Sequence, residues 1–435
     1  MHIPVSGFSK KSKQEKIEWL VHNYFNDNED ALKTLEQYWN SDTGLQELHD
    51  DFTENAISNY YLPFGVAPNF LINDRLYTIP MVIEESSVIA AASNAAKFWL
   101  NRGGFKTEVI STAKNGQVHI DYFGKKESIF NFFTQVKPAL IASIDDIQKN
   151  MKARGGGLVD IELIDSTHTL PGYYQLHCNF ETLDAMGANF INSCLEEIAI
   201  TFEQKATAYS EFSETAPKVV LSILSNYVPE CLVRASVSCN VEELTENGTD
   251  GETFARDYVR AVDIAHTEIR RAVTHNKGIM NGIDAVVLAT GNDFRAVEAG
   301  IHAYAARDGR YTSLTKAKVE NGVFSFSIEI PLALGTIGGL TNLHPLVKFA
   351  MQLLQNPSAR ELMGIVAVAG LAQNFAAIRS LVTTGIQKGH MKMHLMNILN
   401  QLEATSEEKE KAIQHFTKNT VTHSAAVEFI EKLRS

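Results

Sequence analysis

The chain has 435 residues, enough for two or three domains with a sizeable core, and its 45% hydrophobic and 21% charged residues are typical of a soluble globular protein. A formal net charge of −12 argues against nucleic acid and anionic membranes as partners. The four cysteines show no CxxC spacing, so the sequence predicts neither a disulfide framework nor a zinc site.

Two further observations predict a cytoplasmic protein. Residues 1–19 are polar and lysine-bearing, without the apolar segment of a secretory signal. The longest apolar run, at residues 364–372, is about half of the ~20 residues that a membrane span requires. We therefore expect reduced thiols and no membrane contact.

The N-terminal part of the chain predicts a helix, a loop, a strand and a second helix. Residues up to 40 carry apolar side chains at helical spacing, and proline and glycine interrupt residues 54–68 as in a loop. A strand over residues 77–83 runs into Glu84-Glu85-Ser86-Ser87, where a serine can cap the next helix. A buried carboxyl group at such a junction has a raised pKa and can donate a proton near neutral pH. The alternative is that both carboxylates only stabilise the positive start of the helix.

Residues 105–218 predict a compact segment of mixed helices and strands. The flanks of Asn115-Gly116 favour a β-hairpin with a type I′ turn, and a helix bent at Pro138 follows. Strands are predicted over residues 158–163 and 173–180.

A turn of small residues, Asp184-Ala185-Met186-Gly187-Ala188-Asn189, follows these strands and opens a helix. Small residues in a first helical turn let a phosphate approach the free backbone N–H groups and the positive end of the helix dipole. The chain has no G-x-G-x-x-G motif, so an ordinary Rossmann site is not predicted. The alternative is that Asp184 is a plain N-cap and Gly187 a packing contact.

The segment from Thr274 to Asp284 presents Lys277 among small and amide residues. An apolar run at residues 285–289 predicts a strand that leads through Gly291-Asn292-Asp293 to another helix. A lysine and an aspartate this close in sequence can polarise a carbonyl and hold a proton network. The alternative is a surface lysine and a helix-capping aspartate.

Near the C-terminus, His390 lies between glycines and a predicted helix, where a histidine can act as a general acid. His390 and His394 have the spacing of a metal-binding pair, but HExxH and a third ligand are missing, so no metal is predicted. A capping box at Thr405 and Glu408 indicates a further helix.

Taken in order, these motifs resemble the class II 3-hydroxy-3-methylglutaryl-coenzyme A (HMG-CoA) reductases over nearly the whole chain. The resemblance rests on the Glu54-Asn55 loop, the Glu85 junction, Asp184 to Asn189, His275 to Gly282, Gly291 to Gly300, Leu371-Ala372-Gln373-Asn374, and Gly385 to His390. It implies a mixed α/β (α+β) fold in which a large HMG-CoA-binding domain carries an inserted small, non-Rossmann NAD(P)-binding domain and a C-terminal helical flap. We assign residues 1–104 and 219–377 to the large domain, 105–218 to the small domain and 378–435 to the flap.

The resemblance also implies the reaction, a four-electron reduction of HMG-CoA to mevalonate and coenzyme A in isoprenoid synthesis. Lys277 would polarise the thioester carbonyl and the later aldehyde oxygen, and Glu85 would donate the proton. Asp293 would link these two residues and tune both, and His390 would protonate the departing coenzyme A thiolate.

Further positions match contacts to the ligands. Ser87, Arg271 and Asn281 match residues that bind the HMG group, and Asn226 matches a contact to the substrate or the nicotinamide. The cofactor would bind at Asp184, Met186, Gly187 and Asn189. The resemblance implies an active site shared between two subunits, hence a homodimer or a trimer of dimers.

Three residues depart from the family pattern: Ser86 in place of proline, Ser58 in place of glycine and Phe294 in place of tryptophan. None removes a catalytic group. Either NADPH or NADH can serve as the cofactor, and we favour NADPH. The alternatives are a catabolic mevalonate dehydrogenase that uses NAD in the reverse direction, and a coenzyme A-binding protein without turnover.

Overall fold

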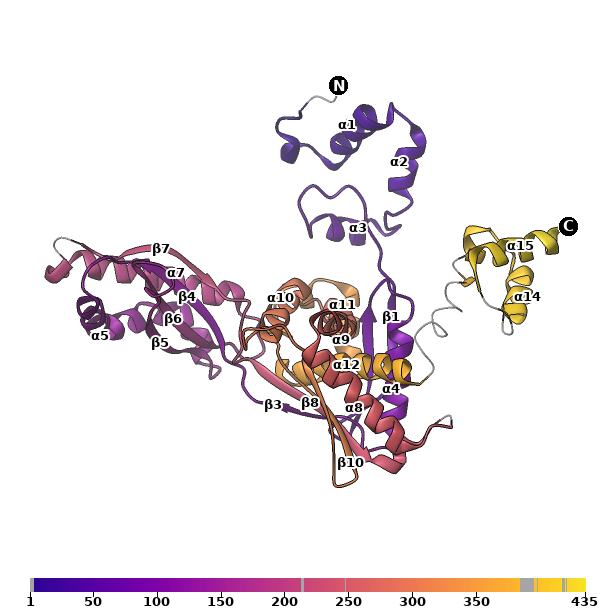
Figure 1. Cartoon of the computed structure of the whole chain (residues 1–435). Coiled ribbons are helices and arrows are strands. Elements are labelled where there is room, and N and C mark those ends of the chain that lie inside the picture. Colours follow the sequence, from indigo (N-terminus) through magenta and orange to yellow (C-terminus); the bar gives the residue numbers. More distant parts are fainter. Residues whose placement is uncertain are drawn as a thin grey trace. The chain divides into compact units, whose positions relative to one another are not determined.

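The computed structural model describes residues 4–212, 215–246, 248–383, 395–396, 398–416, 419 and 421–435 (Figure 1). Contacts divide the chain into two compact units, Met1–Pro63 and Phe64–Ser435. His390 and His394 lie outside the described residues.

The first unit is a small helical assembly. Its elements are η1 (Phe8–Lys10), α1 (Lys13–Phe25), α2 (Glu29–Glu36) and α3 (Thr43–Asp50). Ser12 and Glu15 form a capping box at the start of α1, so two of its free N–H groups are satisfied. An ion pair of 2.7 Å between Lys13 Nζ and Asp50 Oδ2 joins α1 to α3.

The second unit contains an antiparallel sheet in the order β3-β8-β10-β9 and a separate β1-β2 hairpin. The strands are β1 (Phe64–Ile72), β2 (Arg75–Val82), β3 (Lys106–Val109), β8 (Leu232–Asn240), β9 (Thr315–Glu320) and β10 (Val323–Pro331). The helices packed with them are α4 (Val88–Leu100), η3 (Val241–Leu244), α8 (Gly251–Thr267), α9 (Ile269–Ala289), α10 (Phe294–Ala305), η4 (Gly339–Asn342), α11 (Pro345–Leu353) and α12 (Ala359–Val382).

Helix α12 is the centre of this core. It is long and apolar enough to cross a membrane by length and composition, but 67% of its most apolar window is buried inside the fold, which identifies a core helix. It packs along α9, where a side chain on Gly282 would clash with the carbonyl of Ala369. The fully buried rings of Trp99, Tyr258 and Phe375 pack together beside it, with ring centroids of Trp99 and Phe375 5.1 Å apart.

A second antiparallel sheet, in the order β5-β6-β4-β7, has its own hydrophobic core. Its strands are β4 (Lys114–Asp121), β5 (Gly157–Asp165), β6 (Tyr173–Glu181) and β7 (Lys218–Leu224), and its helices are α5 (Lys126–Ser143), α6 (Asp145–Lys152), α7 (Ala188–Thr207) and η2 (Ser210–Phe212). Every second residue of β6 is buried, so one face of this sheet packs on helices. An antiparallel sheet differs from the parallel sheet of a Rossmann fold, as the sequence predicted.

Three local predictions were wrong. Asn115-Gly116 does not turn, because β4 runs straight through it and β3 pairs with β8 instead. Residues 285–289 are the end of α9 rather than a strand, because a short apolar run has no periodicity that separates a buried helix from a buried strand. The predicted loop at 54–68 ends earlier, since β1 begins at Phe64.

The C-terminal helices α14 (Ser406–Phe416) and α15 (His423–Arg434) share a small core of their own. The predicted capping box is present: Glu408 accepts from the Thr405 N–H at 2.7 Å, and Thr405 Oγ1 accepts from the Glu408 N–H at 3.3 Å. The domain boundaries drawn from the sequence stay predictions.

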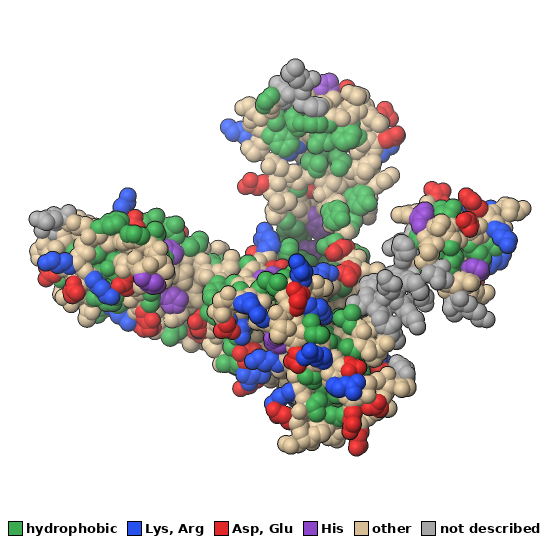
Figure 2. All heavy atoms as spheres, viewed as in Figure 1, with side chains coloured by type: hydrophobic (Ala, Val, Ile, Leu, Met, Phe, Trp, Pro, Cys, Tyr) green, Lys and Arg blue, Asp and Glu red, His purple; other side chains and the backbone are tan. Residues whose placement is uncertain are grey.

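The surface carries both signs of charge, and the cysteines lie inside the fold. Basic and acidic side chains are interspersed over the region of α8 and β10 in the view of Figure 2. All four cysteines are free and buried: Cys178, Cys194, Cys231 and Cys239.

Candidate functional site

A lysine and a glutamate from distant parts of the sequence meet at the edge of α9. Lys277 Nζ lies 2.9 Å from Glu85 Oε2, and the Asn281 side-chain amide donates to the same oxygen at 3.3 Å. Lys277 and Asn281 are one turn apart on α9, and Glu85 lies in the turn between β2 and α4. Glu85 follows β2 in the chain, and β2 packs against α9. The β1–β2 hairpin therefore holds Glu85 close to Lys277.

This pair is open to a ligand. The side chain of Lys277 is 62% exposed and that of Glu85 is 35% exposed. Ion pairs at such exposure contribute about 0–1 kcal/mol, so a carbonyl oxygen can compete for the ammonium group at little cost. The arrangement therefore suits a reaction in which a polarised oxygen receives a proton from a neighbouring carboxyl group.

Asp293 lies at the N-cap of α10. Its carboxylate accepts from the backbone N–H groups of Arg295 at 3.0 Å and Ala296 at 3.2 Å, and pairs with the Arg295 guanidinium at 3.1 Å. Burial alone would raise the Asp293 pKa, but these donors outweigh burial and lower it. The described contacts of Asp293 are thus with α10 itself, rather than with Lys277 or Glu85.

A second carboxyl group lies one turn beyond Asn281. Burial raises the pKa of Asp284 on α9, and the neighbouring carboxyl group of Glu298 on α10 raises it further. Glu298 Oε2 lies 3.3 Å from His302 Nε2, and His302 Nδ1 lies 2.8 Å from the Tyr311 hydroxyl. The sequence did not single out these polar residues around Asp284, although Asp284 shares the helix face of Lys277 at positions i and i+7.

The remaining predicted substrate contacts lie on the same elements. Ser87 is the N-cap residue of α4, where its side chain makes no capping hydrogen bond. Arg271 lies in the first turn of α9, half-buried, and burial lowers the pKa of its guanidinium group.

The predicted cofactor turn is tied to the large core. Asp184 does not cap α7, because its carboxylate accepts from the Ala359 N–H at the start of α12 at 2.7 Å. Its backbone carbonyl accepts from the Thr336 N–H at 2.8 Å. Gly187 is the N-cap of α7, with a φ of 91° that glycine adopts readily, and makes no side-chain cap. The first N–H groups of α7 therefore have no capping side chain.

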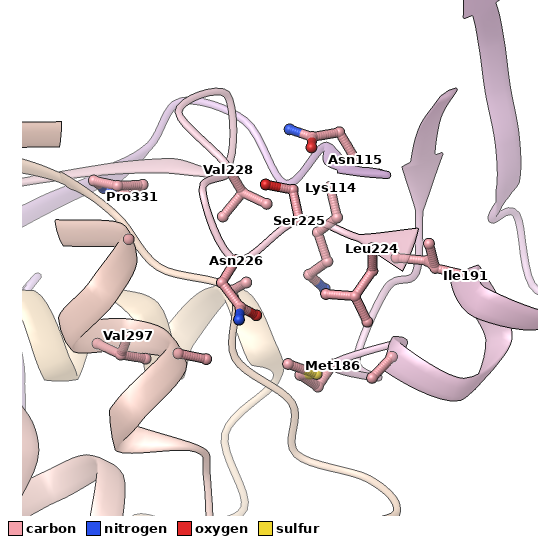
Figure 3. Close-up of a pocket in the computed structure, with 14 residues that line it drawn as sticks. Lys114, Asn115, Met186, Ile191, Leu224, Ser225, Asn226, Val228, Val297 and Pro331 are labelled. Carbon is pink, nitrogen blue, oxygen red and sulfur yellow. The ribbon is translucent and has the colours of Figure 1, made fainter. Parts of the chain in front are cut away.

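Met186 and Asn226 line one cavity of about 20 Å³, which holds about one water molecule (Figure 3). The cavity also touches the start of α7 and the Val297 face of α10. It brings a predicted cofactor residue beside a predicted substrate residue, whereas Asn189 is exposed on the first turn of α7.

Lys114 lines the same cavity and was not singled out from the sequence. Its side chain is buried, with 4% exposed, and Nζ donates to Thr182 Oγ1 at 2.5 Å and to the Ala185 carbonyl at 2.9 Å. Burial lowers its pKa. A lysine beside a predicted turn gives no sequence signal of burial. Among the described residues, no group of three or more histidine, cysteine or acidic side chains could hold a metal ion.

Fold and site together define a mixed α/β protein with a lysine–carboxylate pair at the edge of α9 and, on a separate element, a start of α7 without a capping side chain. A model of the hydroxymethylglutaryl-coenzyme A reductase family matches residues 13–395. The chain is 36% identical to the 3-hydroxy-3-methylglutaryl-coenzyme A reductase of Archaeoglobus fulgidus over 99% of this chain and 95% of the relative. It is 32% identical to the probable reductase of Borreliella burgdorferi over 99% and 97%.

Solved structures agree. The HMG-CoA reductase of Streptococcus pneumoniae superposes with a TM-score of 0.73 at 34% identity, covering 99% of this chain and 100% of that one. The class II reductase of the same organism, solved bound to NADPH in open conformations, gives a TM-score of 0.72 at 33% identity over 98% and 100%. The chain belongs to the hydroxymethylglutaryl-coenzyme A reductase family of oxidoreductases.

Proposed function

We propose that this protein reduces HMG-CoA to mevalonate and coenzyme A in the cytoplasm, with two molecules of NADPH, at a site built on Lys277 and Glu85. The observation that carries the proposal is the 2.9 Å contact between these two side chains, with Asn281 on the same carboxylate oxygen. Its exposure leaves room for a carbonyl oxygen to take the place of the glutamate at the ammonium group.

The chain's own residues then hold and move protons. NADPH, when bound, supplies a hydride to the carbonyl carbon in each of two steps. In the first step Lys277 stabilises the oxygen that gains charge, and Glu85 protonates it. As the carbon–sulfur bond breaks, the hydroxyl proton returns to Glu85 and His390 protonates the thiolate. Glu85 then protonates the aldehyde oxygen in the second step. The overall reaction consumes two protons, one delivered through Glu85 and one through His390.

The turn at residues 184–189 fits a dinucleotide. Its small side chains leave the start of α7 accessible, and the first N–H groups of that helix have no capping side chain. Such N–H groups suit a pyrophosphate. We assign Asp184, Met186, Gly187 and Asn189 to the cofactor and Ser87, Arg271, Asn226 and Asn281 to HMG-CoA. Asp293 would tune the Lys277–Glu85 pair in the assembled homodimer.

The test follows nicotinamide absorbance in purified protein with HMG-CoA, separately with NADPH and NADH, while free thiol is titrated. Two nicotinamides oxidised per thiol released, faster with NADPH, is the expected result. Oxidation of mevalonate with NAD and coenzyme A alone would favour the catabolic alternative. Sedimentation at working concentration tests the dimer. If the protein is folded and dimeric but shows no turnover in either direction, the result would favour the alternative of a coenzyme A-binding protein without catalytic activity.

A further inference from the structure

Lys114 is a buried cation without a carboxylate partner in the described part of the chain. Its side chain is 4% exposed, and its two hydrogen-bond acceptors, Thr182 Oγ1 and the Ala185 carbonyl, are both neutral. No ion pair of the described residues includes it, and its described hydrogen bonds are the two to these neutral acceptors; the negative charges of Glu181 and Asp184 act on it only from a greater distance. A buried ammonium costs several kcal/mol unless an anion pairs with it.

The two acceptors lie at the root of the cofactor turn. Thr182 lies two residues before Asp184, where the turn begins, and also donates to the Ala185 carbonyl at 2.7 Å. Lys114 therefore holds the turn from β4, while α12 holds it from the other side through the bond from Ala359 to Asp184. Figure 3 shows the Lys114 side chain extending from β4 toward the turn that carries Met186.

The backbone at Gly335 packs against the turn at Met186 and leaves the turn little room to move. A side chain on Gly335 would clash with the backbone N–H of Met186, so the two backbones are in close contact. Small shifts of Ala185 would therefore change where the first N–H groups of α7 point.

We propose that Lys114 is a positioning residue for the cofactor, which fixes the 184–187 turn through the Ala185 carbonyl and places a buried positive charge beneath the bound pyrophosphate. This rests on the proposed function and extends it to a residue that touches the turn rather than the reacting atoms. The anion of the cofactor supplies a direct charge partner, in addition to the more distant carboxylates of Glu181 and Asp184.

A role of Lys114 in cofactor binding and a role in stability predict different results for its replacement. Methionine has a length similar to that of lysine and carries no charge, so Lys114→Met removes a desolvation cost from the folded protein. A residue kept for packing alone would lower the melting temperature when replaced. A residue kept for binding should leave the melting temperature unchanged or raise it, and weaken the cofactor.

The experiment measures the dissociation constants of NADPH and NADH by nicotinamide fluorescence in the full-length protein. The matched control is Lys205→Met, which removes one exposed positive charge from α7. We expect Lys114→Met to raise both constants about tenfold or more, the size of one charge-assisted hydrogen bond, with an unchanged KM for HMG-CoA. Lys114→Arg should recover part of the loss.

Dissociation constants in Lys114→Met equal to those of Lys205→Met would overturn the proposal. Loss confined to NADPH would also overturn it, because the charge would then serve the 2′-phosphate. A parallel rise in the KM for HMG-CoA and a lower melting temperature would show a structural role. Because binding is read without turnover, these outcomes leave the proposed reaction to its own test.

Discussion

Asp284 on α9 and Glu298 on α10 are neighbouring carboxyl groups one turn beyond Asn281: burial raises the pKa of Asp284, and Glu298 raises it further. A negative charge beside a partly buried carboxyl group favours its protonated form. Asp284 lies on α9, which carries Lys277, and Glu298 lies on α10, which Asp293 caps.

The first prediction concerns stability against pH. The folded pKa of Asp284 lies above the unfolded value, so the folded state binds the extra proton and loses stability as pH rises from about 4 toward the raised pKa. Asp284→Asn keeps the shape of the side chain and removes the titration. The melting-temperature difference, variant minus wild type, should therefore grow from about pH 5 to about pH 8. Parallel curves, like those expected for the exposed control Glu242→Gln, would contradict it.

The second prediction concerns Lys277. Lys277→Ala should lower kcat for both reduction steps by at least about 10²–10³-fold, because the developing oxyanion loses its cationic partner. The side chain is 62% exposed, so the free energy of unfolding should change by less than about 1 kcal/mol. Steady-state rates with HMG-CoA and with mevaldehyde, beside urea denaturation, check both parts. Appreciable turnover would remove Lys277 from its assigned role.

The third prediction separates the half-reactions. His390→Gln should slow the reduction of HMG-CoA but spare that of mevaldehyde, since only the first releases a thiolate that needs a proton. Equal losses with both substrates would mean that His390 serves another purpose.

The fourth prediction tests the α9–α12 contact with two glycines of one helix. Gly282→Ala should destabilise the fold by about 1–3 kcal/mol, because the added methyl group meets the Ala369 carbonyl. A methyl group on Gly278 would meet open space. Gly278→Ala should therefore stabilise the fold by about 0.5–1 kcal/mol through helix propensity. Urea denaturation measures both, and similar effects in the two variants would disprove the close approach.

The sequence predicted the mixed fold and the family because several ordered motifs had to match together. It also placed Glu85 in a turn before a helix, which the structure confirms. It could not reveal that Asn374, within a family motif, is a buried link whose amide donates to the His275 carbonyl at 3.3 Å, one residue before Asn276 and two before Lys277.

Other features depend on tertiary contacts that local patterns do not encode. Asn115-Gly116 favours a turn in isolation, but a side chain at Gly116 would clash with Leu195 of α7, so glycine serves packing there. Asp184 looks like the cap of its own helix, yet it caps α12, which begins much later in the chain. The burial of Lys114 likewise follows from the docking of β4 beneath the turn.

The burial of every cysteine has a practical consequence for an enzyme that releases a thiol. Desolvation raises the pKa of Cys194 to about 12 and those of Cys231 and Cys239 to about 11, and it raises that of Cys178 further. Thiolates are the reactive species, so these side chains exchange slowly with disulfides. Coenzyme A that has oxidised to its disulfide should therefore form no mixed disulfide with the native protein. In an activity assay, a chromogenic disulfide reagent should therefore report only the thiol of released coenzyme A, with no background from the cysteines of the protein.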